Sequence, residues 1–213
     1  MPFDLWLAFV AASTALLLIP GPTVLLVLSY ALSKGRSVAV ASAAGVALGD
    51  LAAMSASLMG LGALVLASAT LFTALKWVGA VYLVWLGIRL IRSAPSAGMS
   101  SGVIAAPNAQ VTGRGVLVHA AAVTALNPKS IAFFIAFVPQ FLTLDAPLLP
   151  QCAILIATFV ALAALNALAW ALLADRLRAR IARPGVIAWI TRGGGAALIA
   201  MGLMTALVRR GAA

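Results

Sequence analysis

An aspartate and a lysine interrupt an otherwise apolar sequence and are its strongest candidates for chemistry. Asp50 lies inside the apolar run 38–64, and Lys129 lies inside the apolar run 115–142. Charged side chains at such positions are costly and usually mark a substrate or ion pathway, so both residues are functional candidates. A carboxylate and an ammonium group can each bind an opposite charge, or they can pair with each other. The sequence leaves both alternatives open.

A Pro-Gly-Pro motif at residues 20–22 predicts a break in the first apolar helix. Proline lacks an amide hydrogen, so the two prolines leave the carbonyls of Leu16 and Leu18 without their helical donors. With Gly21 between the prolines, we expect the helix to unwind here and to restart near Thr23. The amide groups of the restarted helix would then face an anion, and the freed carbonyls would face a cation.

An Asn-Pro-Lys motif at residues 127–129 predicts a second break of the same kind. Pro128 leaves the carbonyl of Thr124 without its donor, and Asn127 is a favourable cap for the helix that follows. Non-helical backbone at membrane depth is tolerated only where it lines a protein interior or a water-filled cavity. Both motifs therefore predict a polar site inside the protein.

The elements that must position these residues are membrane-spanning helices. Apolar residues make up 64% of the 213-residue chain and charged residues 8%, whereas soluble domains have roughly 45–50% and about 25%. So few charges cannot cover a water-facing surface, and the apolar runs lack the alternating polarity of a membrane barrel. We predict an all-α polytopic membrane protein with six spans, at about 3–32, 38–64, 68–91, 115–142, 148–174 and 186–208.

The placement of basic residues predicts the orientation of these spans. Ten of the 14 lysines and arginines fall on one side, which the positive-inside rule assigns to the cytoplasm. They are Lys34, Arg36, Arg89, Arg92, Arg114, Arg176, Arg178, Arg180, Arg183 and Arg192. Both termini are then expected outside. Basic residues at helix ends are typical of topology signals and contacts with membrane lipids, so the net charge of +10 does not predict a nucleic-acid partner.

The two breaks and the buried acid are predicted to share one depth. Counted from the cytoplasmic end of each span, Pro22, Asp50 and Pro128 lie about 10 to 13 residues in, which is roughly 15–20 Å at about 1.5 Å per residue. These three positions lie within about one helical turn of one another. The candidate chemistry is therefore concentrated near the middle of the membrane.

The chain divides into two predicted halves joined by a linker within one membrane domain. Residues 93–114 are rich in Ser, Gly, Pro and Ala and form a cytoplasmic linker between a first half, 1–92, and a second half, 115–213. Each half contains three spans, an odd number, so the two halves have opposite orientations in the membrane. Because spans 1 and 4 are both broken, the pattern indicates a 3+3 inverted repeat, which is a common plan of secondary transporters.

Several further polar and small residues lie inside the predicted spans. Tyr82 and Asn166 could contact a substrate or could simply bond a neighbouring carbonyl. Gly45 and Gly49 are four residues apart and favour close helix packing over ligand contact. His119, the only histidine, is expected to be a packed or interfacial side chain rather than a proton relay.

Other classes of function are poorly supported. One histidine, one cysteine and four scattered acids supply no cluster of metal ligands. Cys152 is alone, so a dithiol relay is excluded, and no nucleophile–base pair of an enzyme is visible. We therefore predict no catalytic residue, no metal site and no cofactor.

Three stretches resemble the LysE/RhtB family of bacterial amino-acid exporters. They are PGPTVLLVLSYALSKGRSVAVASAAGVALGD at 20–50, LKWVGAVYLVWLGIRLIRS at 75–93 and ALNPKSIAFFIAFVPQF at 125–141. They occur in the family's order and spacing, so the resemblance extends over nearly the whole chain, with the final two spans matching only in hydropathy. The resemblance implies a translocator of the bacterial inner membrane that exports amino acids, driven by protons or the membrane potential. It adds Gly87 to the expected helix-packing glycines.

The residues suit a zwitterionic substrate carried by alternating access. A restarted helix near Thr23, or Asn127 with Lys129, would hold a carboxylate, while Asp50 and the freed carbonyls would hold an ammonium group. Asp50 is also our candidate for the coupled proton, because burial disfavours the charged carboxylate. The predicted binding or gating residues are Pro20, Gly21, Pro22, Thr23, Asp50, Tyr82, Asn127, Pro128, Lys129 and Asn166.

Alternatives to amino-acid export remain. The next most favoured function is export of a divalent metal ion or of another small metabolite. A membrane redox protein or a structural protein is less favoured. The sequence does not distinguish between amino acids or between coupling ions, and it leaves a homo-oligomer open.

Overall fold

The computed structural model contains helices and no strand among the residues that it describes, which are 1–19, 21–34, 38–92, 112–143, 146–181 and 184–207. The helices are α1 (Phe3–Leu18), α2 (Pro22–Lys34), α3 (Ala39–Ala67), α4 (Ala69–Arg92), α5 (Gly113–Ala125), α6 (Pro128–Ala136), the 3₁₀ helix η2 (Val138–Phe141), α7 (Leu148–Ile181) and α8 (Pro184–Leu207). The all-α prediction is confirmed. Most of the predicted linker 93–114 lies outside the described residues, and α5 begins two residues earlier than predicted, after its cap Thr112.

Both predicted breaks are present. The axes of α1 and α2 differ by 56°, and the axis of α5 differs from that of the segment Pro128–Phe141 by 47°. Proline stands at the first position of both α2 and α6, where its missing amide hydrogen costs no helical hydrogen bond. The prolines therefore end one helix and begin the next, as their chemistry requires.

Among the described residues, three straight segments are long and apolar enough to span a membrane, namely Ala39–Gly62, Thr73–Arg92 and Leu148–Ala174, and the number rises to five if each bent pair is one span. Helix α8 covers the predicted sixth span 186–208 up to residue 207, the last one described. It is not among those five segments, so the six-span count remains a prediction. Large apolar side chains face outward, for example Val78, Leu149 and Trp189 at 65%, 82% and 78% exposure. This surface fits a polytopic membrane protein, because lipid is its natural solvent.

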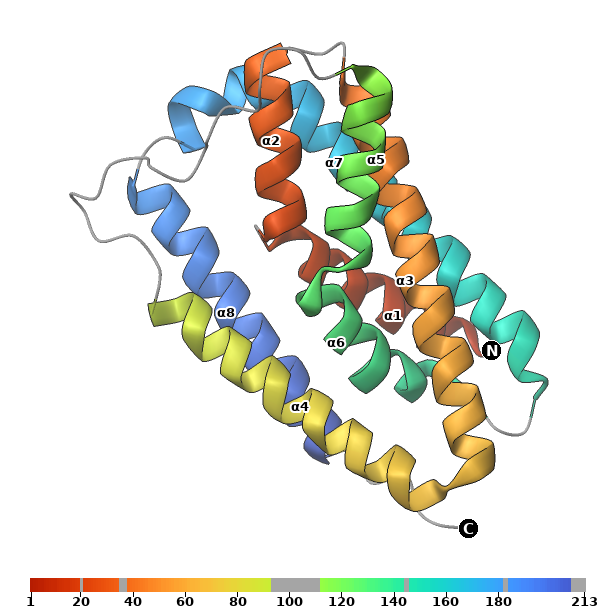
Figure 1. Cartoon of the computed structure of the whole chain (residues 1–213). Helices are drawn as coiled ribbons and strands as arrows, with labels where there is room; N and C mark the ends of the chain where they lie inside the picture. The colour runs from red at the N-terminus through yellow and green to blue at the C-terminus, as the bar shows by residue number, and fades with distance from the viewer. Residues whose placement is uncertain (20, 35–37, 93–111, 144–145, 182–183, 208–213) are drawn as a thin grey trace.

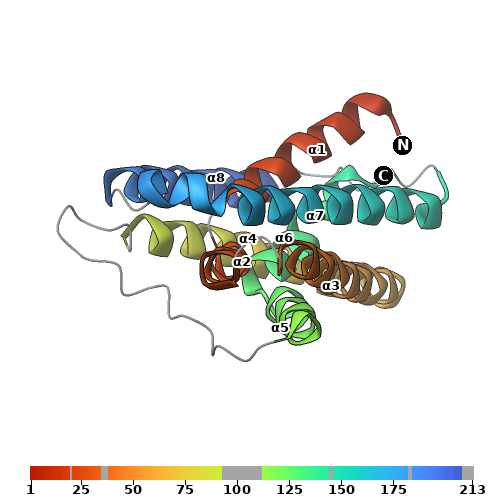
Figure 2. The ribbon, with the colours of Figure 1, turned by 90° about the horizontal axis from the view of Figure 1, so that it is seen from above.

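Helices α4 and α8 lie side by side (Figure 1), and the bundle as a whole is arranged in layers. Seen from above, α7 and α8 form one layer, α5 lies on the opposite side, and α2, α3, α4 and α6 lie between them (Figure 2). Helix α3 packs mainly against α5 and α7. The site described below therefore has helices on all sides.

Helices α3 and α5 meet along a seam of glycines. A Cβ added to Gly45 would clash with the carbonyl oxygen of Leu117, and one added to Gly49 would lie 2.5 Å from the carbonyl oxygen of Ala121. Both contacts advance by four residues in the same direction, so the helices run parallel. The two glycines thus allow the backbones of α3 and α5 to touch.

A second seam joins α4 to α8. A Cβ on Gly87 would lie 2.5 Å from the carbonyl oxygen of Gly195, and one on Gly202 would lie 2.7 Å from that of Ala80. These contacts run in opposite directions along the chain, so the helices are antiparallel. Parallel α3 and α5 and antiparallel α4 and α8 agree with the alternating directions of successive spans.

An aromatic cluster anchors α6 immediately after its first turn. The Phe134 ring meets Phe159 of α7 edge to face at 4.8 Å, and Phe133 lies 5.9 Å from the same ring. Phe141 of η2 meets Phe9 of α1 at 5.3 Å. Aromatic pairs of this geometry stabilise beyond the area that they bury, so the cluster holds α6 against α7 and η2 against α1.

Candidate functional site

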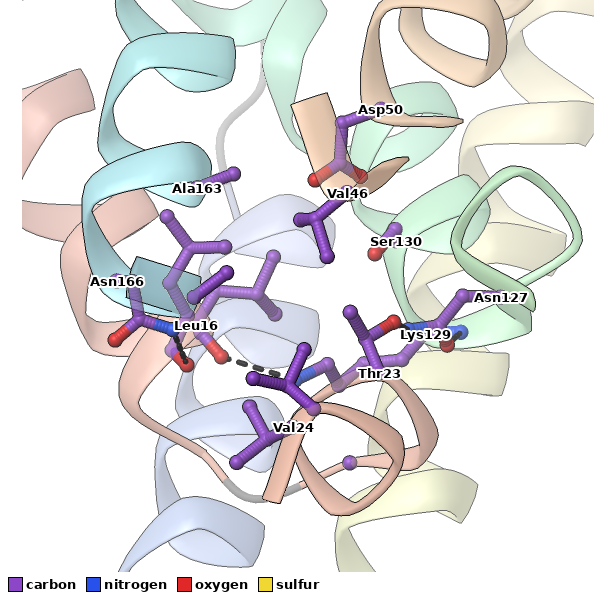
Figure 3. Close-up of a pocket in the computed structure, with 14 residues that line it drawn as sticks. Leu16, Thr23, Val24, Val46, Asp50, Asn127, Lys129, Ser130, Ala163 and Asn166 are labelled. Carbon is purple, nitrogen blue, oxygen red and sulfur yellow. Dashed lines mark hydrogen bonds between the residues drawn. The ribbon is translucent and has the colours of Figure 1, made fainter. Parts of the chain in front are cut away.

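A small cavity lies where the two broken helices meet α3 and α7 (Figure 3). Its volume is about 20 Å³, which is enough for a water molecule and too little for an amino acid. It is lined by Leu16, Leu17, Gly21, Thr23, Val24, Val27, Val46, Asp50, Asn127, Lys129, Ser130, Ala163, Asn166 and Ala167. The site in this structure is therefore too small for the proposed kind of substrate to enter without a rearrangement of its lining.

Asp50 of α3 has an unsatisfied oxygen in this cavity. The residue is 2% exposed, and its Oδ1 has no hydrogen-bond partner. Figure 3 shows the carboxylate directed toward Val46 and Ser130. A buried carboxylate without a partner is unfavourable unless it is protonated or meets a cation, so this side chain points to a ligand or a proton.

Lys129 binds the carbonyl end of α1. Its ammonium Nζ donates to the carbonyl oxygens of Leu16 and Ile19, each at 3.0 Å, and the residue is 8% exposed. A cation at a helix C-terminus is stabilised by the helix dipole. Gly21 makes room for it, since a Cβ there would lie 3.3 Å from Nζ.

Thr23 ties the two breaks together. Its Oγ1 accepts hydrogen bonds from Asn127 Nδ2 at 3.1 Å and from Thr124 Oγ1 at 3.3 Å. The Asn127 side chain also accepts from the amide of Lys129 at 3.1 Å and so caps α6. The cap predicted for Asn127 is present, and the same side chain bridges to α2.

The acceptors at the end of α1 differ from those predicted. The carbonyl of Leu16 is used as expected, but the next acceptors are Leu17, which receives a 3.1 Å bond from Asn166 Nδ2, and Ile19. Leu18, which was predicted to supply a freed carbonyl, does not line the cavity. Its side chain is 55% exposed, because α1 turns this position outward.

Asp50 and Lys129 share the cavity without forming an ion pair. No N···O distance of 4.0 Å or less joins their charged groups, and each carbonyl bond of Lys129 is made to α1 or the residue after it. The direct pair that the sequence left open is therefore not present in this structure. One charge is satisfied by backbone, and the other is left facing the cavity.

Six of the ten predicted site residues line the cavity, namely Gly21, Thr23, Asp50, Asn127, Lys129 and Asn166. Pro22 and Pro128 begin α2 and α6 and are exposed, so they shape the breaks without facing the cavity. Tyr82 packs against Trp85 on α4 with ring centroids 5.5 Å apart and is not a lining residue. Pro20 lies outside the described residues.

The sequence analysis did not identify two polar groups that the structure shows. Ser130 lines the cavity, and its position next to Lys129 in the sequence was the only signal. Tyr30 of α2 is 2% exposed, and its hydroxyl lies 2.7 Å from Nδ1 of His119 on α5. This pair packs His119 against α2, as expected of a packed or interfacial histidine, and it links the two broken spans away from the cavity.

Comparison with known proteins gives a consistent result over nearly the whole chain. The LysE type translocator family model matches residues 14–208. The homoserine/homoserine lactone efflux protein of Salmonella typhimurium LT2 is 34% identical over 210 residues, covering 98% of this chain and 99% of that protein. A leucine efflux protein of Klebsiella pneumoniae is 27% identical over 141 residues, 66% of this chain and 65% of that protein. No solved structure matches.

Proposed function

The chain belongs to the LysE type translocator family, and from this premise we propose that it is a secondary transporter exporting amino acids or close derivatives from the bacterial cytoplasm. Relatives are named for efflux of homoserine, its lactone and leucine, so homoserine and leucine are the first substrates to test. The protein is proposed to lie in the cytoplasmic membrane with both termini outside. Translocation requires no bond chemistry, so no catalytic residue is assigned.

The observation that carries this proposal is a buried, unpartnered carboxylate at the meeting point of two broken helices. Asp50 supplies a negative charge to the cavity, and the end of α1 supplies carbonyl oxygens. Both groups attract an ammonium group. The start of α6, capped by Asn127, supplies the opposite polarity and suits a carboxylate. The cavity thus offers complementary ends to a zwitterion.

Alternating access is supported by the distribution of hydrogen bonds around the cavity. Those made by the side chains of Thr23, Asn166 and Lys129 each join residues 1–92 to residues 115–213. A change that opens the cavity to one side must break several of them. Binding energy from a substrate could offset that loss, which is how a carrier couples binding to movement.

Asp50 is our candidate for the coupled proton, and the membrane potential is the alternative driving force. Its carboxylate is the one acidic group among the cavity residues. A proton on Asp50 would remove the buried charge, so loading and release could accompany the opening of the cavity.

The metal-exporter alternative finds no comparable support. Within the described residues, no group of three His, Cys, Asp or Glu side chains comes together. Divalent transition metals need several such ligands. Amino-acid export therefore remains the function that we propose.

Amino-acid profiles of medium and cytosol test the proposal. A bacterial strain overproducing the protein is fed dipeptides, so that amino acids accumulate inside, and is compared with the same strain producing Asp50→Asn at equal level. We expect at least one amino acid to rise in the medium and fall in the cytosol with the wild-type protein. Unchanged export of every amino acid relative to an empty vector would contradict it.

A further inference from the structure

At the end of α1, beside the cavity, the carbonyl oxygens of Leu16, Leu17 and Ile19 all accept side-chain hydrogen bonds, and the pair from Leu16 and Ile19 is called the carbonyl cup below. Leu16 and Ile19 direct their oxygens to the same ammonium nitrogen, and Leu17 accepts from Asn166. Carbonyl oxygens at a helix C-terminus carry partial negative charge and attract cations. Two oxygens converging at 3.0 Å on one nitrogen therefore make a site for an ammonium group.

The present occupant of this cup is the side chain of Lys129. A lysine Nζ is a primary ammonium with three donors, and the ammonium group of an amino acid has the same chemistry. Lys129 uses two of these donors on the cup and none on Asp50, although both residues line the cavity. The lysine is thus placed as a substrate amine would be.

The size of the cavity also indicates that Lys129 must move before a substrate can bind. The cavity of about 20 Å³ cannot hold an amino acid together with Lys129 in its present position. Lys129 is 8% exposed and lies against Gly21 and the end of α1, so its departure would enlarge the cavity at the cup. Asp50, whose Oδ1 has no partner, offers the displaced ammonium a place in the same cavity.

We propose that the carbonyls of Leu16 and Ile19 form the subsite for the substrate's ammonium group, and that Lys129 occupies this subsite whenever substrate is absent. The proposal rests on the proposed export function. Substrate binding displaces Lys129 toward Asp50, and substrate release returns it to the cup. Lys129 thereby satisfies the carbonyls in the empty carrier and allows it to close and return without substrate.

This role separates two transport modes. Net efflux requires the empty carrier to return, whereas exchange of one amino acid for another never does. Lys129→Met removes the competing ammonium, so we expect exchange to persist, net efflux to fall at least tenfold, and substrate affinity to rise, because a competitor for the subsite is gone. Lys129→Gln retains amide donors for the carbonyls but has no ammonium group. It replaces Lys129→Met in both transport assays if the methionine variant does not fold.

The full-length protein in proteoliposomes loaded with radiolabelled homoserine or leucine provides the assay. Net efflux is measured into amino-acid-free buffer, and exchange into buffer with the same unlabelled amino acid. Lys76→Met, the same substitution on α4 outside the cavity, should leave both modes unchanged. A folded Lys129 variant that loses both modes equally, or keeps both, overturns the proposal.

A chemical-labelling experiment on the wild-type protein tests the same proposal without any substitution. An amine-reactive, membrane-permeant reagent is applied with and without saturating homoserine, and labelling of Lys129 is quantified by mass spectrometry. Because homoserine carries a primary amine and consumes part of the reagent, labelling of Lys129 is expressed as a ratio to labelling of Lys76. We expect homoserine to raise this ratio, and an unchanged or lower ratio overturns the proposal. The failure of the proposed function looks different. In that case the wild-type protein moves neither homoserine nor leucine in either mode, and the overproducing strain exports no amino acid into the medium.

Discussion

Gly49→Ala is expected to destabilise the protein by pushing α5 away from α3. The added Cβ would lie 2.5 Å from the carbonyl oxygen of Ala121, 2.7 Å from Cβ of Thr124 and 3.0 Å from the amide nitrogen of Ala125. Two of these neighbours are backbone atoms that cannot rotate away. To reach an ordinary contact of 3.4 Å, α5 must withdraw by about 0.9 Å. Overpacking of this kind costs about 1–3 kcal/mol.

Gly60→Ala is the matched control, because it is the same substitution on the same helix at a position with no atom within 4 Å. It is expected to leave the free energy of unfolding unchanged or to raise it by up to about 1 kcal/mol, because alanine favours a helix more than glycine does. Reversible unfolding in mixed micelles, followed by circular dichroism, compares the two variants. Because Thr124 is carried by α5 and bonds Thr23, the proposed amino-acid export should also fall in Gly49→Ala. Equal unfolding midpoints for the two variants would refute the close approach of α3 and α5.

Three further predictions concern single hydrogen-bonding groups. Asp50→Asn should fold normally, because Oδ1 has no partner to lose. The variant should nevertheless abolish the dependence of export on a pH gradient in proteoliposomes, and unchanged pH-driven export would exclude Asp50 as the proton carrier. Thr23→Val should cost about 1–3 kcal/mol, because it leaves two buried donors without their acceptor, and Thr23→Ser should restore most of this in thermal unfolding. A double-mutant cycle of Tyr30→Phe and His119→Phe should give a coupling energy of about 1 kcal/mol for the 2.7 Å contact, and additive effects would exclude that bond.

The breaks in spans 1 and 4 could be predicted because they follow from covalent chemistry. Proline removes an amide hydrogen wherever it stands, so Pro128 had to begin a helix. Counting residues at a constant rise predicted one shared depth for Asp50 and the breaks, and in the structure Gly21, Asp50 and Asn127 line one cavity. These properties do not depend on how one helix is rotated against another.

The contacts of Lys129 and the place of Tyr82 could not be predicted, because they depend on that rotation. Two opposite charges at one depth suggest a pair, but α6 directs Lys129 to the end of α1 and leaves Asp50 facing the cavity. Tyr82 lies on α4, whose main partner is α8. Ser130 became a lining residue only through the face that α6 turns inward. Packing decided each of these outcomes.

The glycine seams bear on which parts of the molecule can move as rigid bodies. Helix α3 belongs to residues 1–92 and touches α5 of residues 115–213 backbone to backbone, and α4 touches α8 across the same division. Rocking the first half against the second would shear both seams, where interlocked backbone atoms leave little room to slide. A hinge motion that preserves them moves α3 with α5 and α4 with α8. The mechanical units of this protein would then be mixed pairs, each taking one helix from either end of the chain.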